Sequence, residues 1–188
     1  MPILSARERE VVAVGAAIGA GCRPCTNYHV RAGLKAGLTE DEIRLAVDEA
    51  EVLRIHAATA IADFARGLLG SSEERAAPLC TPTEPLQALA EVGAATGSNA
   101  GHALDRLLPY ARGLGLSGGA LSEAVEMAGA VKRMAAEFFA KDADLALGVE
   151  GEVVPPAEGG SCAEAAQPCA GAPAGSSGPA SSATTSCC

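Results

Sequence analysis

The chain has 188 residues, a formal net charge of −9, three Phe, two Tyr and no Trp. An acidic chain without a cluster of Lys and Arg lacks the electrostatic surface that binds nucleic acid or anionic membranes. No stretch is long and apolar enough to span a bilayer, and the opening segment MPILSARERE lacks the apolar run of a signal peptide. We therefore expect a cytoplasmic protein whose partners are small molecules or other proteins, with no nucleic acid and no membrane.

Apolar residues recur at helical spacing along most of the first 148 residues. This pattern predicts six helices. The third has the clearest start, because Thr39 can cap it and Glu42 completes a capping box. Gly37 is suited to end the second helix, whereas Gly21 offers no side-chain oxygen to cap its start. The expected ranges are 6–20, 22–37, 40–68, 84–97, 100–113 and 118–145.

The sequence repeats itself, without gaps, at an offset of 78 residues. The matched residues include Gly15 with Gly93, Ala16 with Ala94, Ala17 with Ala95, Gly19 with Gly97, Gly37 with Gly115 and Leu38 with Leu116. A constant offset of this kind indicates a tandem duplication of one helical unit. We expect an all-α fold with a first repeat at 1–78, a second repeat at 79–148 and a tail at 149–188.

Four residues of the first repeat form a candidate redox site with the spacing E-x11-C-x2-C-x3-H, namely Glu10, Cys22, Cys25 and His29. In a helix that starts at residue 22, both sulfurs and the imidazole lie on one stripe. A thiol in the first turn of a helix is activated by the positive end of the helix dipole, and an imidazole four residues later can accept its proton. Glu10, on the preceding helix, is placed to fold back and orient His29 or pass it a proton through water.

The segment GCRPCTNYHVRAGLKAGLTEDEI, preceded by Glu10, resembles the alkylhydroperoxidase D-like branch of the carboxymuconolactone decarboxylase family. The resemblance covers roughly residues 5 to 145. It implies an all-helical fold, a homo-oligomer with a trimer favoured, and a cysteine pair that reduces peroxides or disulfides. By the family pattern, Cys25 attacks the peroxide, Cys22 resolves the product, and His29 with Glu10 forms the proton relay. Pro24 stands where some members carry a histidine.

The second repeat lacks this constellation. Its matching positions carry Ala88, Ala100, Ala103 and Leu107. Small apolar side chains at all four positions suit burial against the first repeat, so we expect the second copy to be structural.

The leading functional prediction is a thiol-dependent peroxidase or disulfide oxidoreductase, an enzyme of the peroxiredoxin type that resembles the alkylhydroperoxidases. It would need no cofactor and no resident metal, and an external dithiol or a peroxiredoxin-like protein would be its reductant. One alternative is a protein that binds soft metals or metalloids through its cysteines. A zinc site at Cys22, Cys25 and His29 would require a distant fourth ligand. A second alternative is a non-redox catalyst with a decarboxylase-like pocket, although the CxxC pair argues against lactone decarboxylation.

From about residue 150 the composition changes to Gly, Pro, Ser and Ala without hydrophobic periodicity, which predicts disorder. This tail holds four of the seven cysteines. A chain of its length reaches roughly 30 to 35 Å, so its thiols could visit the CxxC pair. We hypothesise that Cys187 and Cys188 exchange disulfides or pass soft ions to Cys22 and Cys25. The auxiliary thiols of this hypothesis are Cys162, Cys169, Cys187 and Cys188, and the alternative is that they are incidental or bind thiophilic ions themselves.

The remaining candidate residues have less specific interpretations. His56 and His102 have no evident chemical partner in the sequence, so we expect ordinary packing or surface residues. Cys80 lies in the linker between the repeats and is expected to be a free thiol. Tyr28 either lines the entrance of the redox site or forms part of a helix interface.

Overall fold

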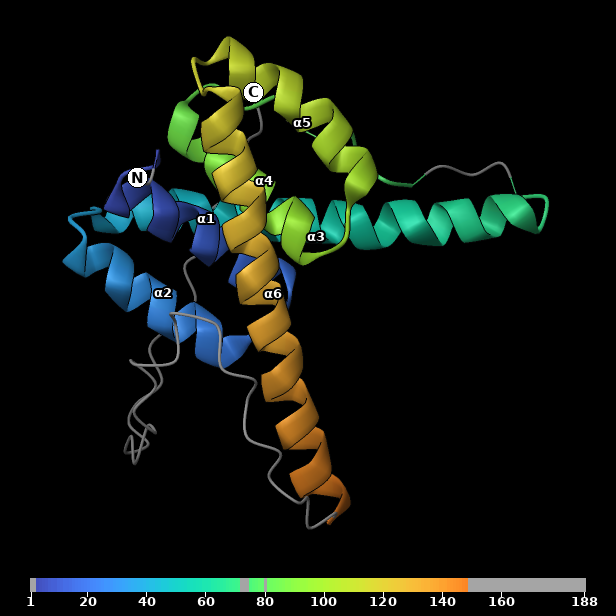
Figure 1. Ribbon diagram of the computed structural model, residues 1–188. Coiled ribbons are helices and arrows are strands. Elements are labelled where there is room, and N and C mark those ends of the chain that lie inside the picture. The colour runs from blue at the N-terminus through green and yellow to red at the C-terminus, as the bar shows by residue number, and fades with distance from the viewer. Residues whose placement is uncertain (1–2, 72–74, 80, 149–188) are drawn as a thin grey trace, which may run out of the picture. The chain divides into compact units, whose positions relative to one another are not determined.

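The computed structural model describes residues 3–71, 75–79 and 81–148 of the chain. This part contains six α-helices and no strand (Figure 1), so the predicted all-helical class is confirmed. Each helix begins and ends within two residues of its expected position. The helices are α1 (Ala6–Gly19), α2 (Arg23–Lys35), α3 (Glu40–Leu68), α4 (Pro85–Gly97), α5 (Gly101–Gly113) and α6 (Gly118–Leu147).

Two kinds of prediction fall on residues outside these ranges. The tail from 149 onward, with Cys162, Cys169, Cys187 and Cys188, lies outside the described residues, and Cys80 does so as well. Their predicted disorder and thiol chemistry stay predictions.

In the described part of the chain, none of the helices combines the length and apolar character that a bilayer crossing requires.

Helices α1 and α4 cross in direct backbone contact at the centre of this unit (Figure 1). A Cβ atom on Gly15 would lie 2.1 Å from the carbonyl oxygen of Ala90, and one on Gly93 would lie 2.2 Å from that of Val12. Gly19 and Gly97 make the equivalent approaches one turn later. Any side chain at these positions would push the two helices apart. Glycine at these four positions therefore makes this crossing possible.

The two long helices, α3 and α6, pack across the central pair. Their buried faces use residues that match at the offset of 78, so Ala46, Ala50, Leu53 and Ala57 of α3 correspond to Ala124, Ala128, Val131 and Ala135 of α6. The C-terminal halves of both helices extend beyond the shorter helices (Figure 1). Large apolar side chains are exposed on these extensions, including Ile61, Phe64 and Leu68 of α3 and Phe139, Leu145 and Leu147 of α6.

The offset of 78 recurs in the helix bounds and in the turns. The bounds of α4, α5 and α6 follow those of α1, α2 and α3 at this offset to within one residue. Residues with left-handed backbone also match, as Gly21 with Asn99, Gly37 with Gly115 and Gly70 with Gly148. Buried residues of both halves belong to one hydrophobic core. The candidate site residues of the first half thus rest on a core that the second half completes.

The central crossing makes a direct stability prediction. Gly93→Ala should lower the free energy of unfolding by roughly 3 kcal/mol or more, because its methyl group would overlap the backbone of α1. Gly67→Ala, in α3, is the matched control, since a Cβ there meets no atom within 4 Å. It should be neutral or stabilise by up to about 1 kcal/mol through helix propensity. Urea unfolding followed by circular dichroism measures both, and equal effects would contradict the proposed contact.

Candidate active site

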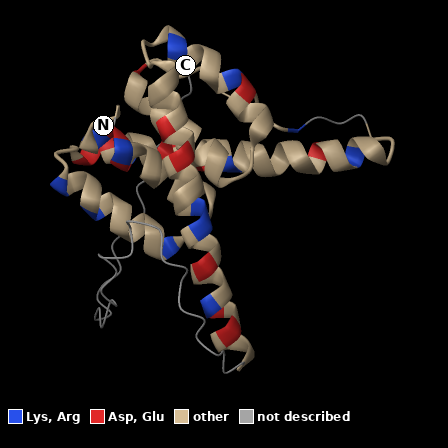
Figure 2. Ribbon diagram, in the orientation of Figure 1, with Lys and Arg blue, Asp and Glu red and all other residues tan. Residues whose placement is uncertain are grey.

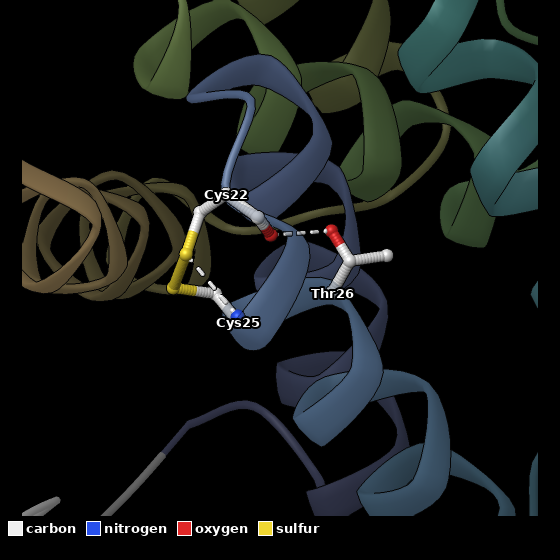
Figure 3. The surroundings of a disulfide bond; sticks show 3 residues. All are labelled: Cys22, Cys25 and Thr26. Carbon is white, nitrogen blue, oxygen red and sulfur yellow. Dashed lines mark hydrogen bonds between the residues drawn. A yellow bond between two sulfur atoms is a disulfide. The ribbon is translucent and has the colours of Figure 1, made fainter. Parts of the chain in front are cut away.

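Cys22 caps α2, the helix that carries Cys25 and His29. The left-handed Gly21 turns the chain out of α1, and α2 begins at Arg23. We expected the helix to start at residue 22 without a side-chain cap, and both points are corrected. Residue 22 is the N-cap, and its Sγ atom accepts a hydrogen bond from the backbone N–H of Cys25 at 3.2 Å. The hydroxyl of Thr26 donates to the carbonyl oxygen of Cys22 at 2.9 Å (Figure 3). These two bonds hold the cysteine loop against the first turn of α2.

Cys22 and Cys25 form a disulfide, with their Cα atoms 5.3 Å apart (Figure 3). Both residues are buried, with exposed fractions of 7% for Cys22 and 3% for Cys25. A bonded pair three residues apart shows that the loop accommodates the oxidised state. Pro24 is tolerated between them because the first turn of a helix has no internal partners for its N–H groups.

The predicted contact between Glu10 and His29 is present in the structure. The Nδ1 atom of His29, on α2, lies 2.9 Å from Oε2 of Glu10, on α1. A carboxylate only accepts hydrogen bonds, so Nδ1 carries the proton and Nε2 is left as the basic nitrogen. His29 follows Cys25 by one helical turn, and the ring of Tyr28 packs edge-on against it with centroids 5.0 Å apart.

A pocket of about 440 Å³ opens beside the disulfide. Its walls come from the turn between α1 and α2, from the end of α4 and from one face of α6. Helix α6 passes beside the two sulfur atoms (Figure 3), and Ala135 and Phe138 are among the residues that it contributes to the wall. Sequence reasoning gave the second half only a packing role and missed this contribution. No local sequence signal marks it, because these residues lie more than 100 positions after Cys22.

The positions of the second half that match the redox residues are all buried. Ala88, Ala100, Ala103 and Leu107 contribute to the hydrophobic core. Small apolar side chains fill the space there, as expected from the sequence.

Two histidines that seemed isolated in the sequence lie together. The rings of His56, on α3, and His102, on α5, have centroids 5.6 Å apart, and Nδ1 of His56 donates to the carbonyl oxygen of Ala77 at 2.7 Å. Both side chains are at least partly exposed, so the expectation of ordinary packing or surface residues agrees with the structure, although the contact between the two rings was not foreseen. His102 lies at the start of α5 and corresponds to Pro24 at the offset of 78. Among the described residues, no group of three or more His, Cys, Asp and Glu side chains is arranged to hold a metal ion.

A buried pair of carboxyl groups, also missed by sequence reasoning, lies between α3 and α4. Glu91 is only 3% exposed. Burial, together with the smaller effect of the neighbouring charge of Glu49, raises its pKa from 4.5 to about 8. Burial also raises the pKa of Glu49, which accepts a hydrogen bond from Gln87 at 2.9 Å. Glu91 is therefore protonated at neutral pH.

This pair makes stability depend on pH. The native state keeps the proton of Glu91 up to about pH 8, whereas the unfolded chain releases it near pH 4.5. The free energy of unfolding should therefore fall as pH rises from about 4.5 to about 8 and level off above. Glu91→Gln mimics the protonated form, so it should be roughly 2 to 4 kcal/mol more stable than wild type at pH 8.5 and similar at pH 5. Urea unfolding over this pH range measures the difference, with the exposed Glu51→Gln as control. A pH-independent difference would contradict the linkage.

The comparison with protein families matches part of the chain. Residues 2–67 match the Carboxymuconolactone decarboxylase family. The match spans α1, α2 and nearly all of α3, and it includes Glu10 and the CxxC pair with His29. The family consists of enzymes and includes alkylhydroperoxidase-like members. No curated protein and no solved structure matches the chain.

Proposed function

We propose that this protein is a thiol-dependent peroxidase or disulfide oxidoreductase of the alkylhydroperoxidase D-like type. The observation that carries the proposal is a disulfide between Cys22 and Cys25, one helical turn before a histidine bound to a carboxylate. The match to the carboxymuconolactone decarboxylase family over residues 2–67 supports it. We place the reaction in the cytoplasm, where thiol reductants return such a pair to the dithiol state.

The oxidative half of the reaction uses the reduced pair. The thiolate of Cys25 attacks one oxygen of the peroxide, the O–O bond breaks, and the alcohol leaves with a proton, so that Cys25 becomes a sulfenic acid. The thiolate of Cys22 then attacks Sγ of Cys25, and the hydroxyl group leaves as water after it accepts a proton. Two electrons have passed from the cysteine pair to the peroxide. The disulfide seen in the structure is the product of this step.

His29 is the base that this sequence of steps requires. A cysteine with a pKa of about 8.5 is mostly protonated at neutral pH, so proton removal accelerates its attack. Nε2 of His29 takes the proton from Cys25 and later supplies one to the leaving hydroxyl group. Glu10 fixes the tautomer and stabilises the imidazolium through its bond to Nδ1. Glu10 is in this sense a positioning residue.

Variants of these four residues test the proposal. Cys25→Ser should abolish peroxide turnover supported by excess dithiothreitol, and Cys22→Ser should allow oxidation of Cys25 without formation of the internal disulfide. His29→Ala should lower kcat/KM by roughly 100-fold, in the range typical of a general base. Glu10→Gln should have a smaller effect and should shift the pH profile of kcat/KM. Steady-state assays with an organic hydroperoxide measure all four.

Matched controls separate chemistry from loss of structure. His102→Ala and Glu51→Gln make the same chemical changes at exposed positions and should keep full activity. Turnover that survives Cys25→Ser would contradict the proposal and favour a non-redox catalyst. Zinc or arsenite retained at fixed stoichiometry by the reduced but inactive protein would favour the soft-metal alternative instead.

We further propose that the chain is a tandem duplication of one helical unit, with repeats at 1–78 and 79–148. Matching helix bounds, left-handed turns and glycine contacts at the offset of 78 support this proposal. Only the first repeat keeps the redox residues. The exchange of disulfides between Cys187 or Cys188 and the CxxC pair stays a prediction, because the tail lies outside the described residues.

We also propose that the protein is a homo-oligomer, with a trimer favoured by the family resemblance. The apolar extensions of α3 and α6 support this, because apolar area on this scale is stabilised when another surface covers it. A second copy of the chain offers the same extensions and can cover them mutually.

Sedimentation velocity tests the oligomer. Wild type should sediment as an assembly larger than a monomer at micromolar concentration. Phe64→Asp should shift it toward monomer, since it places a charge on the apolar extension of α3, whereas Ser122→Asp adds the same charge at an exposed site on the first turns of α6. A monomeric wild type at tens of micromolar protein would contradict the proposal.

A further inference from the structure

The pocket beside the disulfide is lined by one of its two cysteines. Cys22 lines the pocket, and it is the more exposed of the two cysteines, at 7% against 3% for Cys25. A molecule that enters the pocket therefore approaches the disulfide at Cys22, whose reactive atom is Sγ. In the oxidised state, attack at this atom is the first step of disulfide reduction. The pocket is thus placed to receive the reductant.

The charged residues of the pocket favour an anion. Arg23 lines it from the start of α2 and Lys132 from α6, against the single carboxylate of Asp142. The Nζ atom of Lys132 donates a hydrogen bond to Oδ1 of Asn99, which holds the ammonium group beside the pocket. The positive end of the α2 dipole also lies at this point. The pocket is thus net positive, although the chain as a whole has a net charge of −9. Helix α6 carries charges of both signs along its C-terminal half (Figure 2).

The rest of the wall sets the size and character of the ligand. Phe138, Phe139 and Pro24 supply apolar surface around the charged groups. A volume of about 440 Å³ is within the range of small-molecule sites. The chemistry fits a molecule with a short apolar body and one negative group.

We propose that this pocket binds a small anionic thiol, and that Arg23 and Lys132 select it as the reductant of the disulfide. This inference rests on the proposed redox function. The thiolate attacks Sγ of Cys22, the bond between Cys22 and Cys25 breaks, and Cys25 leaves as a thiolate. A second thiolate attacks the sulfur of the bound thiol in this mixed disulfide, which releases the oxidised thiol and the Cys22 thiolate. Two electrons pass from the two thiols to the protein, and the two cysteines take up protons from water.

Thiols of different charge test the selection. The oxidised full-length protein is mixed with 2-mercaptoethanesulfonate, 2-mercaptoethanol or cysteamine, which are anionic, neutral and cationic. The loss of the Cys22–Cys25 disulfide is followed by alkylation and peptide mass spectrometry. Rate constants are corrected for the thiolate fraction and nucleophilicity of each reagent. The anionic thiol should react roughly fivefold to tenfold faster than the neutral one at low salt, and this preference should weaken at high salt.

Variants assign the preference to the pocket. Lys132→Gln and Arg23→Gln should each lower the ratio of the anionic-thiol rate to the neutral-thiol rate, and Lys132→Glu should reverse the preference. Arg133→Gln is the matched control, because it removes one positive charge from the next residue of α6, which does not line the pocket. It should keep the preference of wild type.

The outcomes separate this inference from the proposed function. Equal corrected rates for all three thiols, or variants that slow all three alike, would overturn the anion selection and leave the redox function standing. A disulfide that none of the thiols reduces would overturn both.

Discussion

The backbone contact between α1 and α4 is the constraint on which the rest of the structure depends. Gly15 and Gly93 bring each helix against a carbonyl group of the other, so the distance between the two helices is fixed by main-chain atoms. The long helices α3 and α6 then pack across this pair with faces of Ala, Leu and Val. A chain with few aromatic residues can build a dense core in this way. Because the helix backbones lie in contact, little space remains between them for large side chains to fill.

The site follows from this crossing. Helix α1 carries Glu10 and ends at the left-handed turn of Gly21, which delivers Cys22 to the start of α2. Because α2 packs against α1, His29 meets Glu10. Because α6 crosses the same central pair, it closes one side of the pocket beside the sulfur atoms. The second half of the chain, which has no counterpart of Cys22, Cys25 or His29, thus still shapes the surroundings of these residues.

The sequence predicted the features that depend on local chemistry. Helical periodicity placed all six helices, the Thr39 capping box was correct, and Gly37 does end α2 with a left-handed residue. The contact of Glu10 with His29 was predicted from spacing and is present. The cap at Cys22 was missed because sulfur is a weak acceptor that the usual capping rules leave out.

Features that depend on tertiary packing were not predictable in the same way. Glu49 and Glu91 lie on different helices, and either one, taken alone in the sequence, is typical of a solvated helix face. His56 and His102 lie on different helices, α3 and α5, and meet only in the tertiary structure. The charge of the pocket combines residues from two distant helices, so no sequence window contains it. In each case the missing information is the relative placement of helices.

The central claim is that Cys22 and Cys25 act together as a two-electron redox pair. The most direct measurement is a single turnover, in which the fully reduced protein receives one equivalent of an organic hydroperoxide and peptide mass spectrometry locates the oxidised cysteines. The account predicts one Cys22–Cys25 disulfide for each peroxide consumed, with the other five cysteines still reduced. A pair that stays reduced, or that oxidises no faster than the other cysteines, would contradict it.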